Sequence, residues 1–174
     1  MVDAAQVIPI VPVEEHVRRV RRQNSELQAV WDLLDVVKDP EVPVLSLWEL
    51  GVLQDVREQA GDLVVSITPT YSGCPALQTM REDIVEVLHC SGYANVRVET
   101  RLSPAWTTDW LSETARKQLR QYGISPPIKY LDQILCPLCG SSATSLISEF
   151  GSTACKALYR CGDCQEPFDY FKTI

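Results

Sequence analysis

The sequence lacks the motifs by which many self-contained enzymes are identified. Its 174 residues contain no Walker loop, dinucleotide fingerprint or nucleophile elbow, so we expect no catalysis of its own. The only histidines are His16 and His89. Glu86 and His89 form one Glu-x-x-His pair, whereas a di-iron carboxylate site needs two such pairs. We therefore assign neither histidine a role.

Positive charge and long apolar runs are also scarce. The net charge is −7, and binding to nucleic acid depends on neutralising phosphates, so we expect no nucleic-acid partner. No run approaches the roughly 20 apolar residues of a membrane-spanning helix, so we expect no membrane partner. Residues 2–13 are interrupted by Pro9 and Pro12 and lack the basic start of a secretory signal. Seven cysteines in such a chain favour a cytoplasmic protein with metal-bound and free thiols.

Four of the cysteines form two clips near the C-terminus. Cys136 and Cys139 make the first clip, Cys161 and Cys164 the second, and each leaves two residues between its sulfurs. One tight turn with this spacing can aim two sulfurs at a single ion, and two clips complete a tetrahedral zinc site. Two disulfides, a redox dithiol or an iron–sulfur site are the alternatives. A zinc with four sulfur ligands has no open position, so we predict that it is structural and staples a small tail.

The order of elements ahead of the ribbon predicts an α+β domain in which helices pack on a small mixed sheet. An amphipathic pattern begins after Asn24 or Ser25, and alternating apolar residues mark the strands. The expected elements are a helix over 25–37, a hairpin of strands 52–57 and 63–68, a helix from 75 to about 91, a strand over 96–102, and a helix over 106–122.

These patterns divide the chain into four parts. We predict a flexible, charged lead-in at 1–24, the α+β domain at 25–124, a linker at 125–134 and the zinc ribbon at 135–174. The lead-in could begin a helix and carries four arginines, at 18, 19, 21 and 22. No aromatic residue interleaves with them, so we interpret them as a solvated helix face in preference to a partner-binding patch.

Cys74 is the sharpest candidate for chemistry outside the ribbon. It follows a strand and Gly73, and Pro75 suits the first position of a helix, which places Cys74 at or beside the N-cap. The unpaired N–H groups and the macrodipole at a helix start favour the thiolate, the form that binds metals. A small buried core residue is the alternative. Cys90, at the far end of the same helix, is predicted to fill the core.

Two further features are ambiguous from local sequence. Asp39 and Glu41 flank Pro40 in a rigid turn and could orient or protonate a group held by Cys74, although solvated turn carboxylates are the ordinary interpretation. Cys155 is a fifth cysteine in the ribbon, where a tetrahedral site needs only four ligands. We predict that it is a small packed residue, and a reactive thiol beside Lys156 is the alternative.

Several of these residues also resemble a known family. Residues 39–43 (DPEVP), 50–52 (LGV) and 70–75 (TYSGCP) are similar to motifs of the metal–sulfur cluster assembly factors of the MIP-eighteen type. With 150–156 (FGSTACK) and 166–172 (EPFDYFK), the chain resembles the accessory D subunits associated with the phenylacetyl-CoA epoxidase (ring 1,2-monooxygenase) complex of aerobic phenylacetate catabolism.

The resemblance implies an accessory protein that assembles or delivers the iron–sulfur cluster of the reductase component. By position, Cys74 matches the family's functional cysteine, Asp39 and Glu41 its acidic turn, and Cys136, Cys139, Cys161 and Cys164 its ribbon ligands. A single thiolate coordinates a cluster incompletely, so sulfurs from a second protomer, as in a homodimer, or from the client would complete it. A zinc-binding structural or regulatory subunit and a thiol-dependent redox protein remain the alternatives.

Overall fold

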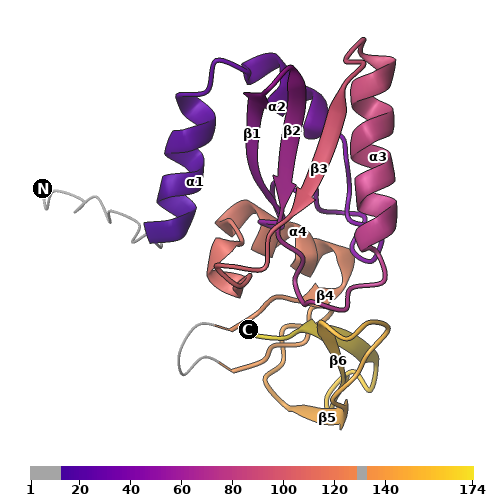
Figure 1. The fold of residues 1–174 in the computed structure, drawn as a ribbon. Coiled ribbons are helices and arrows are strands. Elements are labelled where there is room, and N and C mark those ends of the chain that lie inside the picture. The colour runs from indigo at the N-terminus through magenta and orange to yellow at the C-terminus, as the bar shows by residue number, and fades with distance from the viewer. Residues whose placement is uncertain (1–12, 129–132) are drawn as a thin grey trace, which may run out of the picture.

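The computed structural model describes residues 13–128 and 133–174 (Figure 1). The predicted α+β domain and the four-cysteine ribbon are both confirmed. The elements are α1 (Val13–Gln23), α2 (Gln28–Leu34), β1 (Leu53–Gln59), β2 (Asp62–Ile67), α3 (Leu77–Cys90), β3 (Val96–Thr100), the 3-10 helix η1 (Thr108–Trp110), α4 (Glu113–Tyr122), β4 (Ile124–Ser125), β5 (Thr144–Ser148), β6 (Lys156–Cys161) and β7 (Pro167–Phe171).

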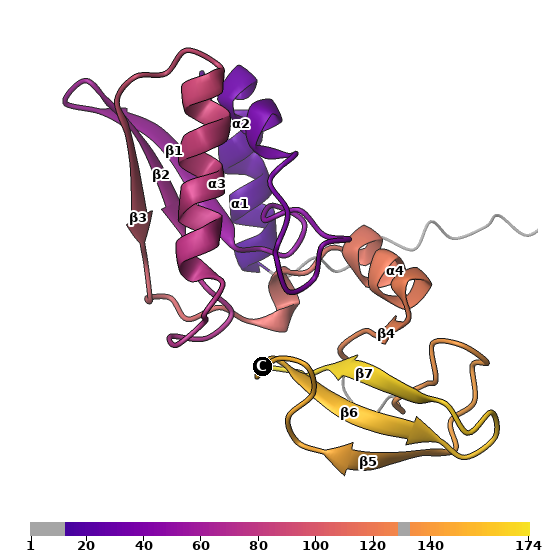
Figure 2. The ribbon, with the colours of Figure 1, turned by 90° about the vertical axis from the view of Figure 1, so that its right-hand side faces the viewer.

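The first sheet organises the main domain, which we define as residues 13–122. Its order is β1-β2-β3, with β1 and β2 antiparallel, as the predicted hairpin requires, and with β3 parallel to β2 after the α3 crossover. Val64, Val65 and Ile67 of the central strand are completely buried. Helices α2 and α3 lie on one face of this sheet (Figure 2), where they contribute Trp31, Leu34, Met80, Ile84 and Leu88 to the core.

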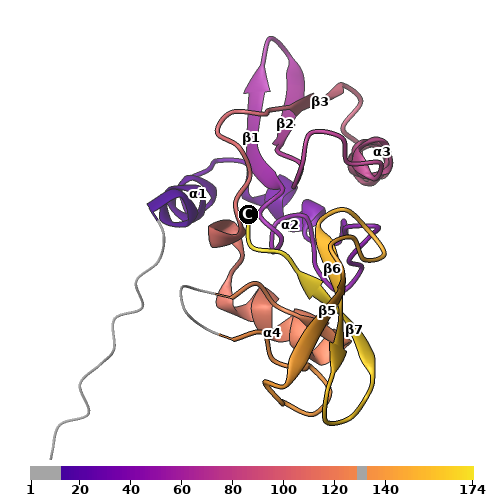
Figure 3. The same ribbon diagram turned by 90° about the horizontal axis from the view of Figure 1, so that it is seen from below.

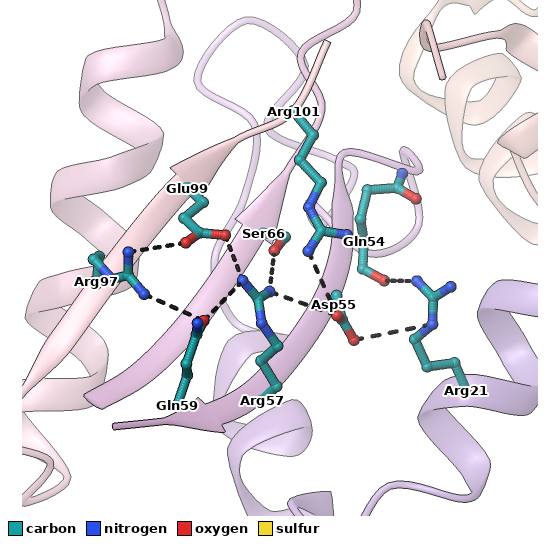
Figure 4. A network of polar contacts seen from close by, with 9 residues as sticks. All are labelled: Arg21, Gln54, Asp55, Arg57, Gln59, Ser66, Arg97, Glu99 and Arg101. Atoms are coloured by element: carbon teal, nitrogen blue, oxygen red, sulfur yellow. Dashed lines mark hydrogen bonds and ion pairs between the residues drawn. The ribbon is translucent and has the colours of Figure 1, made fainter. Parts of the chain in front are cut away.

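The opposite face of the sheet is covered by charged side chains that bind one another (Figure 4). Arg57 is at the centre: its guanidinium donates to the Ser66 hydroxyl at 2.8 Å and pairs with Glu99 at 2.5 Å. Arg97 pairs with the same Glu99 carboxylate at 3.0 Å. Because alternate residues of a strand point to opposite faces, the sheet has one apolar and one polar face, and the core lies on the helix side.

Helix α1 corrects the prediction of a solvated face at Arg18, whereas Arg19 and Arg21 are exposed as predicted. Residues 13–23 are helical, and Arg18 is only 4% exposed. Its guanidinium donates to the carbonyls of Trp48 at 3.0 Å, Leu53 at 3.3 Å and Trp110 at 3.3 Å, and it lies 4.5 Å from the Trp48 ring. These acceptors are remote in sequence, so the helix belongs to the main domain. Residues 1–12 of the predicted lead-in lie outside the described residues.

Two predicted helices are shorter in the structure. Helix α2 starts only at Gln28, because the Ser25 hydroxyl accepts from the N–H of Leu27 at 3.1 Å and closes a turn instead of capping a helix. The expected helix over 106–122 divides into η1 and α4, because Leu111 is extended. Ser112 starts α4 anew by accepting the Ala115 N–H at 3.0 Å.

The second sheet is the ribbon, with the order β4-β7-β6-β5. Its first strand, β4, includes Ser125, so the start of the predicted linker is already paired, in parallel, with β7. Residues 129–132 of that linker lie outside the described residues, and the predicted domain limits stay a prediction. Phe171 of β7 is completely buried and lies 6.0 Å from the Trp106 ring of the main domain.

The ribbon lies against the end of the main domain at which α3 begins (Figure 2). Seen from the ribbon side, the loop that leads into β6 lies next to the segment that follows α2 (Figure 3). A hydrogen bond of 3.3 Å from the Lys156 ammonium to the Glu41 carbonyl joins these two segments. Among the described helices, none has the length and apolar character needed to cross a membrane.

Candidate functional site

Four ribbon sulfurs converge on one point. The Sγ atoms of Cys136, Cys139, Cys161 and Cys164 all lie within 4.8 Å of one another. Cys136 and Cys164 are 3.7 Å apart, and Cys139 and Cys161 are 3.5 Å apart. A zinc–sulfur bond of about 2.3 Å implies an edge of about 3.8 Å in a tetrahedron of four sulfurs. The thiols therefore fit a four-coordinate metal ion, and the donor set suits zinc.

Backbone turns hold the two clips in place. The Gly140 N–H donates to the Cys136 carbonyl at 2.9 Å, and Gly140 has φ +78°, a left-handed conformation that favours glycine. In the second clip, the N–H groups of Cys164 and Asp163 bond to the Cys161 sulfur and lower the pKa of that thiol to about 6. A thiolate is the form that binds a metal. Of the four thiols, Cys161 is thus the one whose surroundings favour the thiolate, whereas hydrogen bonds within the group raise the pKa of Cys139 and of Cys164.

Cys74 lies in the loop just before α3. The helix begins at Leu77 with Ala76 as its N-cap, so Cys74 precedes the cap by two residues. Its side chain is 8% exposed. Burial raises the pKa of the Cys74 thiol, and the charges of Glu41 and Asp39 raise it further, while N–H groups of Ala76 and Leu77 lower it less. Burial and two carboxylates therefore outweigh the helix start, and the low exposure of Cys74 agrees with the alternative of a small buried residue.

The Asp39–Glu41 turn is built around a buried carboxylate. Asp39 is 4% exposed, and its Oδ1 accepts the N–H groups of Glu41 and Val42, both at 2.8 Å. Burial raises the pKa of Asp39 and of Glu41. Asp39 is thus not the solvated carboxylate that we expected. Asp39 fixes the turn through these two hydrogen bonds. The Glu41 side chain is half-buried and takes no part in them.

Cys155 belongs to the ribbon in sequence and to the main domain in packing. Its side chain is 3% exposed and is part of the large core, not of the small cluster of Cys136, Cys161 and Phe168. Its Sγ lies 3.8 Å from Glu41 Oε2 and 3.0 Å from the Thr153 hydroxyl. The predicted packed position is correct, although the partner is a carboxylate.

The alternative of an activated Cys155 thiol does not agree with its surroundings. Burial raises the pKa of the Cys155 thiol to about 11, an effect that Lys156 opposes only in part. The Lys156 ammonium is instead 3.4 Å from Asp169 and 3.3 Å from the Glu41 carbonyl. Cys155 is therefore a neutral thiol at neutral pH.

Sequence reasoning missed how these groups are brought together. Tyr71 also lies among them, because burial and the ionised forms of Glu41, Cys74 and Cys155 raise its pKa. Glu41 and Cys155 are 114 positions apart, and no local pattern encodes that contact. Cys90 corrects the other cysteine prediction, because it is exposed at the end of α3. His16 and His89 are exposed, and neither enters the contacts of these thiols described above.

The α+β fold with Cys74 and the ribbon with its four convergent thiols match a two-part class of protein, in which an iron–sulfur cluster assembly domain is joined to a zinc β-ribbon. The family described as "Iron-sulfur cluster assembly protein" matches residues 27–100, and the "PaaD zinc beta ribbon domain" matches residues 128–172. A crystal structure of a domain of unknown function, DUF59, from Bacillus anthracis is similar at 22% identity and TM-score 0.49, over 60% of this chain and 95% of that one.

The chain belongs to the PaaD family. It is 48% identical over 155 residues to the D subunit of the "Putative 1,2-phenylacetyl-CoA epoxidase" of Escherichia coli (strain K12), across 86% of this chain and 94% of that protein. It is also 34% identical over 101 residues to the "Fe-S protein maturation auxiliary factor" of Porphyromonas gingivalis, across 55% of this chain and 95% of that protein. The second relative matches a length close to that of the main domain alone.

Proposed function

We propose that this chain is an accessory protein of the phenylacetyl-CoA epoxidase complex in aerobic phenylacetate catabolism, and that it assembles or delivers the iron–sulfur cluster of the reductase component. The observation that carries the proposal is the position of Cys74, a thiol beside the Asp39–Glu41 turn in a domain of the iron–sulfur assembly class. The names of the two relatives, an epoxidase subunit and a maturation factor, support both halves of the proposal.

Iron, alone or in a cluster, is the cargo in this proposal. The Cys74 thiol is neutral at rest, because burial and the carboxylates raise its pKa, and it has to lose its proton to bind iron. Glu41 is the more exposed of the two carboxylates, and we expect it to pass that proton to water. Because the Cys74 thiol loses its proton only when iron binds, it reacts slowly with electrophiles such as alkylating agents before that.

The ribbon serves as a zinc-stapled docking surface in this proposal. Its four thiols leave no open ligand position, so the ion would hold the tail together and take part in no bond-making step. The ribbon also exposes large apolar side chains, a feature of surfaces that bind other proteins: Leu138, Leu146, Ile147 and Phe150. We expect the reductase to bind there.

The test is maturation of the reductase in cells that supply either the wild-type chain or Cys74→Ser. Iron content and visible absorption of the purified reductase are the measurements. We expect a full cluster with the wild-type chain and with Cys90→Ser, a matched change of an exposed thiol, and little cluster with Cys74→Ser. A fully loaded reductase in the Cys74→Ser background would contradict the proposal.

The alternatives predict different results. A purely structural or regulatory subunit copurifies with the complex and is indifferent to Cys74→Ser. A thiol-dependent redox protein requires one cysteine that is alkylated unusually fast because its pKa is depressed. The pKa values of Cys74 and Cys155 are both raised, which favours neither of them for that role.

A further inference from the structure

We propose that Cys155 of the ribbon is a second iron ligand, acting with Cys74 of the main domain and with the Glu41 carboxylate. We call Cys74 and Cys155 the seam thiols, since they come from the two domains and lie where those domains meet. The inference rests on the proposed function. It adds the source of the second sulfur ligand, which a single Cys74 thiolate cannot supply. In place of a second protomer or the client, this chain's own ribbon supplies that sulfur.

The packing of Cys155 is the first support. A fifth cysteine that served the ribbon would lie with the four convergent sulfurs or in the small cluster around Phe168. Cys155 instead lies in the same core cluster as Cys74. The Cys155 carbonyl accepts the Lys172 N–H at 3.0 Å, so the ends of two ribbon segments hold this thiol against the main domain.

Shared polar neighbours are the second support. Glu41 Oε2 lies 3.8 Å from the Cys155 sulfur, and the charge of the same carboxylate acts on the Cys74 thiol. Tyr71 lies close enough to both seam thiols and to Glu41 for their ionised forms to raise its pKa, which burial also raises. A cysteine that only fills space gains nothing from a half-buried carboxylate, which is costly to keep near an apolar core. Two thiols and a carboxylate are instead donors that ferrous and cluster iron accept.

The position of Lys156 is the third support. This side chain is buried, with its ammonium 3.4 Å from Asp169 and 3.3 Å from the Glu41 carbonyl. Two thiolates and one carboxylate around a ferrous ion carry a net charge of −1. A fixed cation next to that site stabilises the loaded state through a partly desolvated, short-range interaction.

The loading step is ligand exchange without a change of oxidation state. For a hydrated ferrous ion, two Fe–S bonds and one Fe–O bond to Glu41 form as three Fe–OH2 bonds break, and each thiol releases its proton to water. For a cluster delivered by a donor protein, the two thiols transfer their protons to two departing thiolates of the donor. Among the described residues, the four ribbon cysteines are the one group of three or more possible ligands that is already close enough to hold an ion, so the seam site has to close around its cargo.

The test uses the full-length, zinc-loaded chain under anaerobic conditions, with ferrous ion alone in one arm and ferric ion plus sulfide, the oxidation states of a [2Fe–2S]2+ cluster, in the other. Iron affinity and the number of sulfur neighbours, from X-ray absorption at the iron edge, are measured. Wild type is expected to show two protein sulfurs per ferrous ion. Cys155→Ser and Cys155→Ala should lose one sulfur and bind iron roughly tenfold or more weakly. Cys90→Ser, with unchanged zinc, is the control.

The outcomes separate this inference from the proposed function. If only Cys74→Ser loses iron, while the Cys155 variants keep the wild-type sulfur count, Cys155 is not a ligand and the proposed function stands. If wild type binds iron in neither arm, both proposals fall. Should the Cys155 variants not fold, the wild-type sulfur count decides alone, since a single protein sulfur on ferrous ion overturns the inference. Binding in the first arm points to an ion as cargo, and binding only in the second points to a cluster.

Discussion

The two groups of thiols in this chain differ in how far the fold has prepared them. The ribbon's four sulfurs already lie within 4.8 Å of one another, as one tetrahedral site requires. The seam thiols come from two domains, and burial raises the pKa of both. A preformed site binds its metal tightly and keeps it, whereas a site that its cargo must complete can release that cargo. In our proposal, cysteines therefore hold a permanent metal ion in the ribbon and a transferable one between the two domains.

The largest effect should follow from removing a ribbon ligand. Cys161→Ser, or a strong chelator, should unfold residues 135–174, because binding of a structural zinc contributes on the order of 10 kcal/mol and the ribbon's own cluster contains few buried residues. Limited proteolysis with mass spectrometry should find cuts confined to the ribbon. Cys90→Ser is the matched control. A ribbon that stays resistant to protease without metal would remove the distinction between the two groups.

A smaller loss is expected from the turn that holds Glu41 near the seam thiols. Asp39→Ala leaves the N–H groups of Glu41 and Val42 without their acceptor, which should cost about 1–3 kcal/mol of unfolding free energy. Asp39→Asn keeps an acceptor oxygen and is the matched control. Urea unfolding measures both. Equal stability of the alanine and asparagine variants would show that the turn does not depend on this acceptor.

The neutral state of Cys155 should be visible in the pH dependence of stability. Its thiol pKa rises from an ordinary 9.0 to about 11 in the folded chain. The folded state binds the proton more tightly, so its contribution is complete below about pH 9 and is lost as the pH rises toward 11. Wild type should lose up to about 2 kcal/mol relative to Cys155→Ala over this range. Parallel stability curves for the two proteins would place the Cys155 thiol in a more solvated environment.

The smallest effect on folding is expected at Cys74. Cys74→Ser replaces a neutral thiol by a neutral hydroxyl of similar shape beside polar neighbours, so unfolding free energy should change by less than about 1 kcal/mol. Alkylation at pH 8 should modify the exposed Cys90 first and the seam thiols slowly. A large loss of stability would mean that Cys74 serves mainly in packing, and rapid alkylation of Cys74 would favour the redox alternative.

Sequence reasoning succeeded where the determining pattern is local. The ribbon ligands follow from the two-residue spacing within each clip, and the hairpin follows from the alternating apolar residues of its two strands. The helix after Cys74 also starts near its expected position, because Pro75 and the apolar spacing after it encode it. These features depend on neighbours within a few positions along the chain.

The predictions failed where the partner is remote. Arg18 was assigned to a solvated face because its acceptors, the carbonyls of Trp48, Leu53 and Trp110, are invisible from its own helix. Cys155 could not be connected with Glu41 for the same reason. Cys90 was expected in the core and is exposed, whereas Asp39 was expected in solvent and is buried. Packing between elements decides both outcomes, and neither residue's local sequence encodes it.

Metal analysis of the anaerobically purified chain tests the central distinction most directly. Zinc and iron are measured together in wild type, Cys74→Ser and Cys161→Ser. We predict about one zinc per chain in wild type, as one tetrahedral site requires, together with iron and visible colour. Cys74→Ser should lose the iron and the colour and retain its zinc, whereas Cys161→Ser should lose zinc. Iron that survives in Cys74→Ser, or that disappears only with the ribbon ligands, would contradict this account.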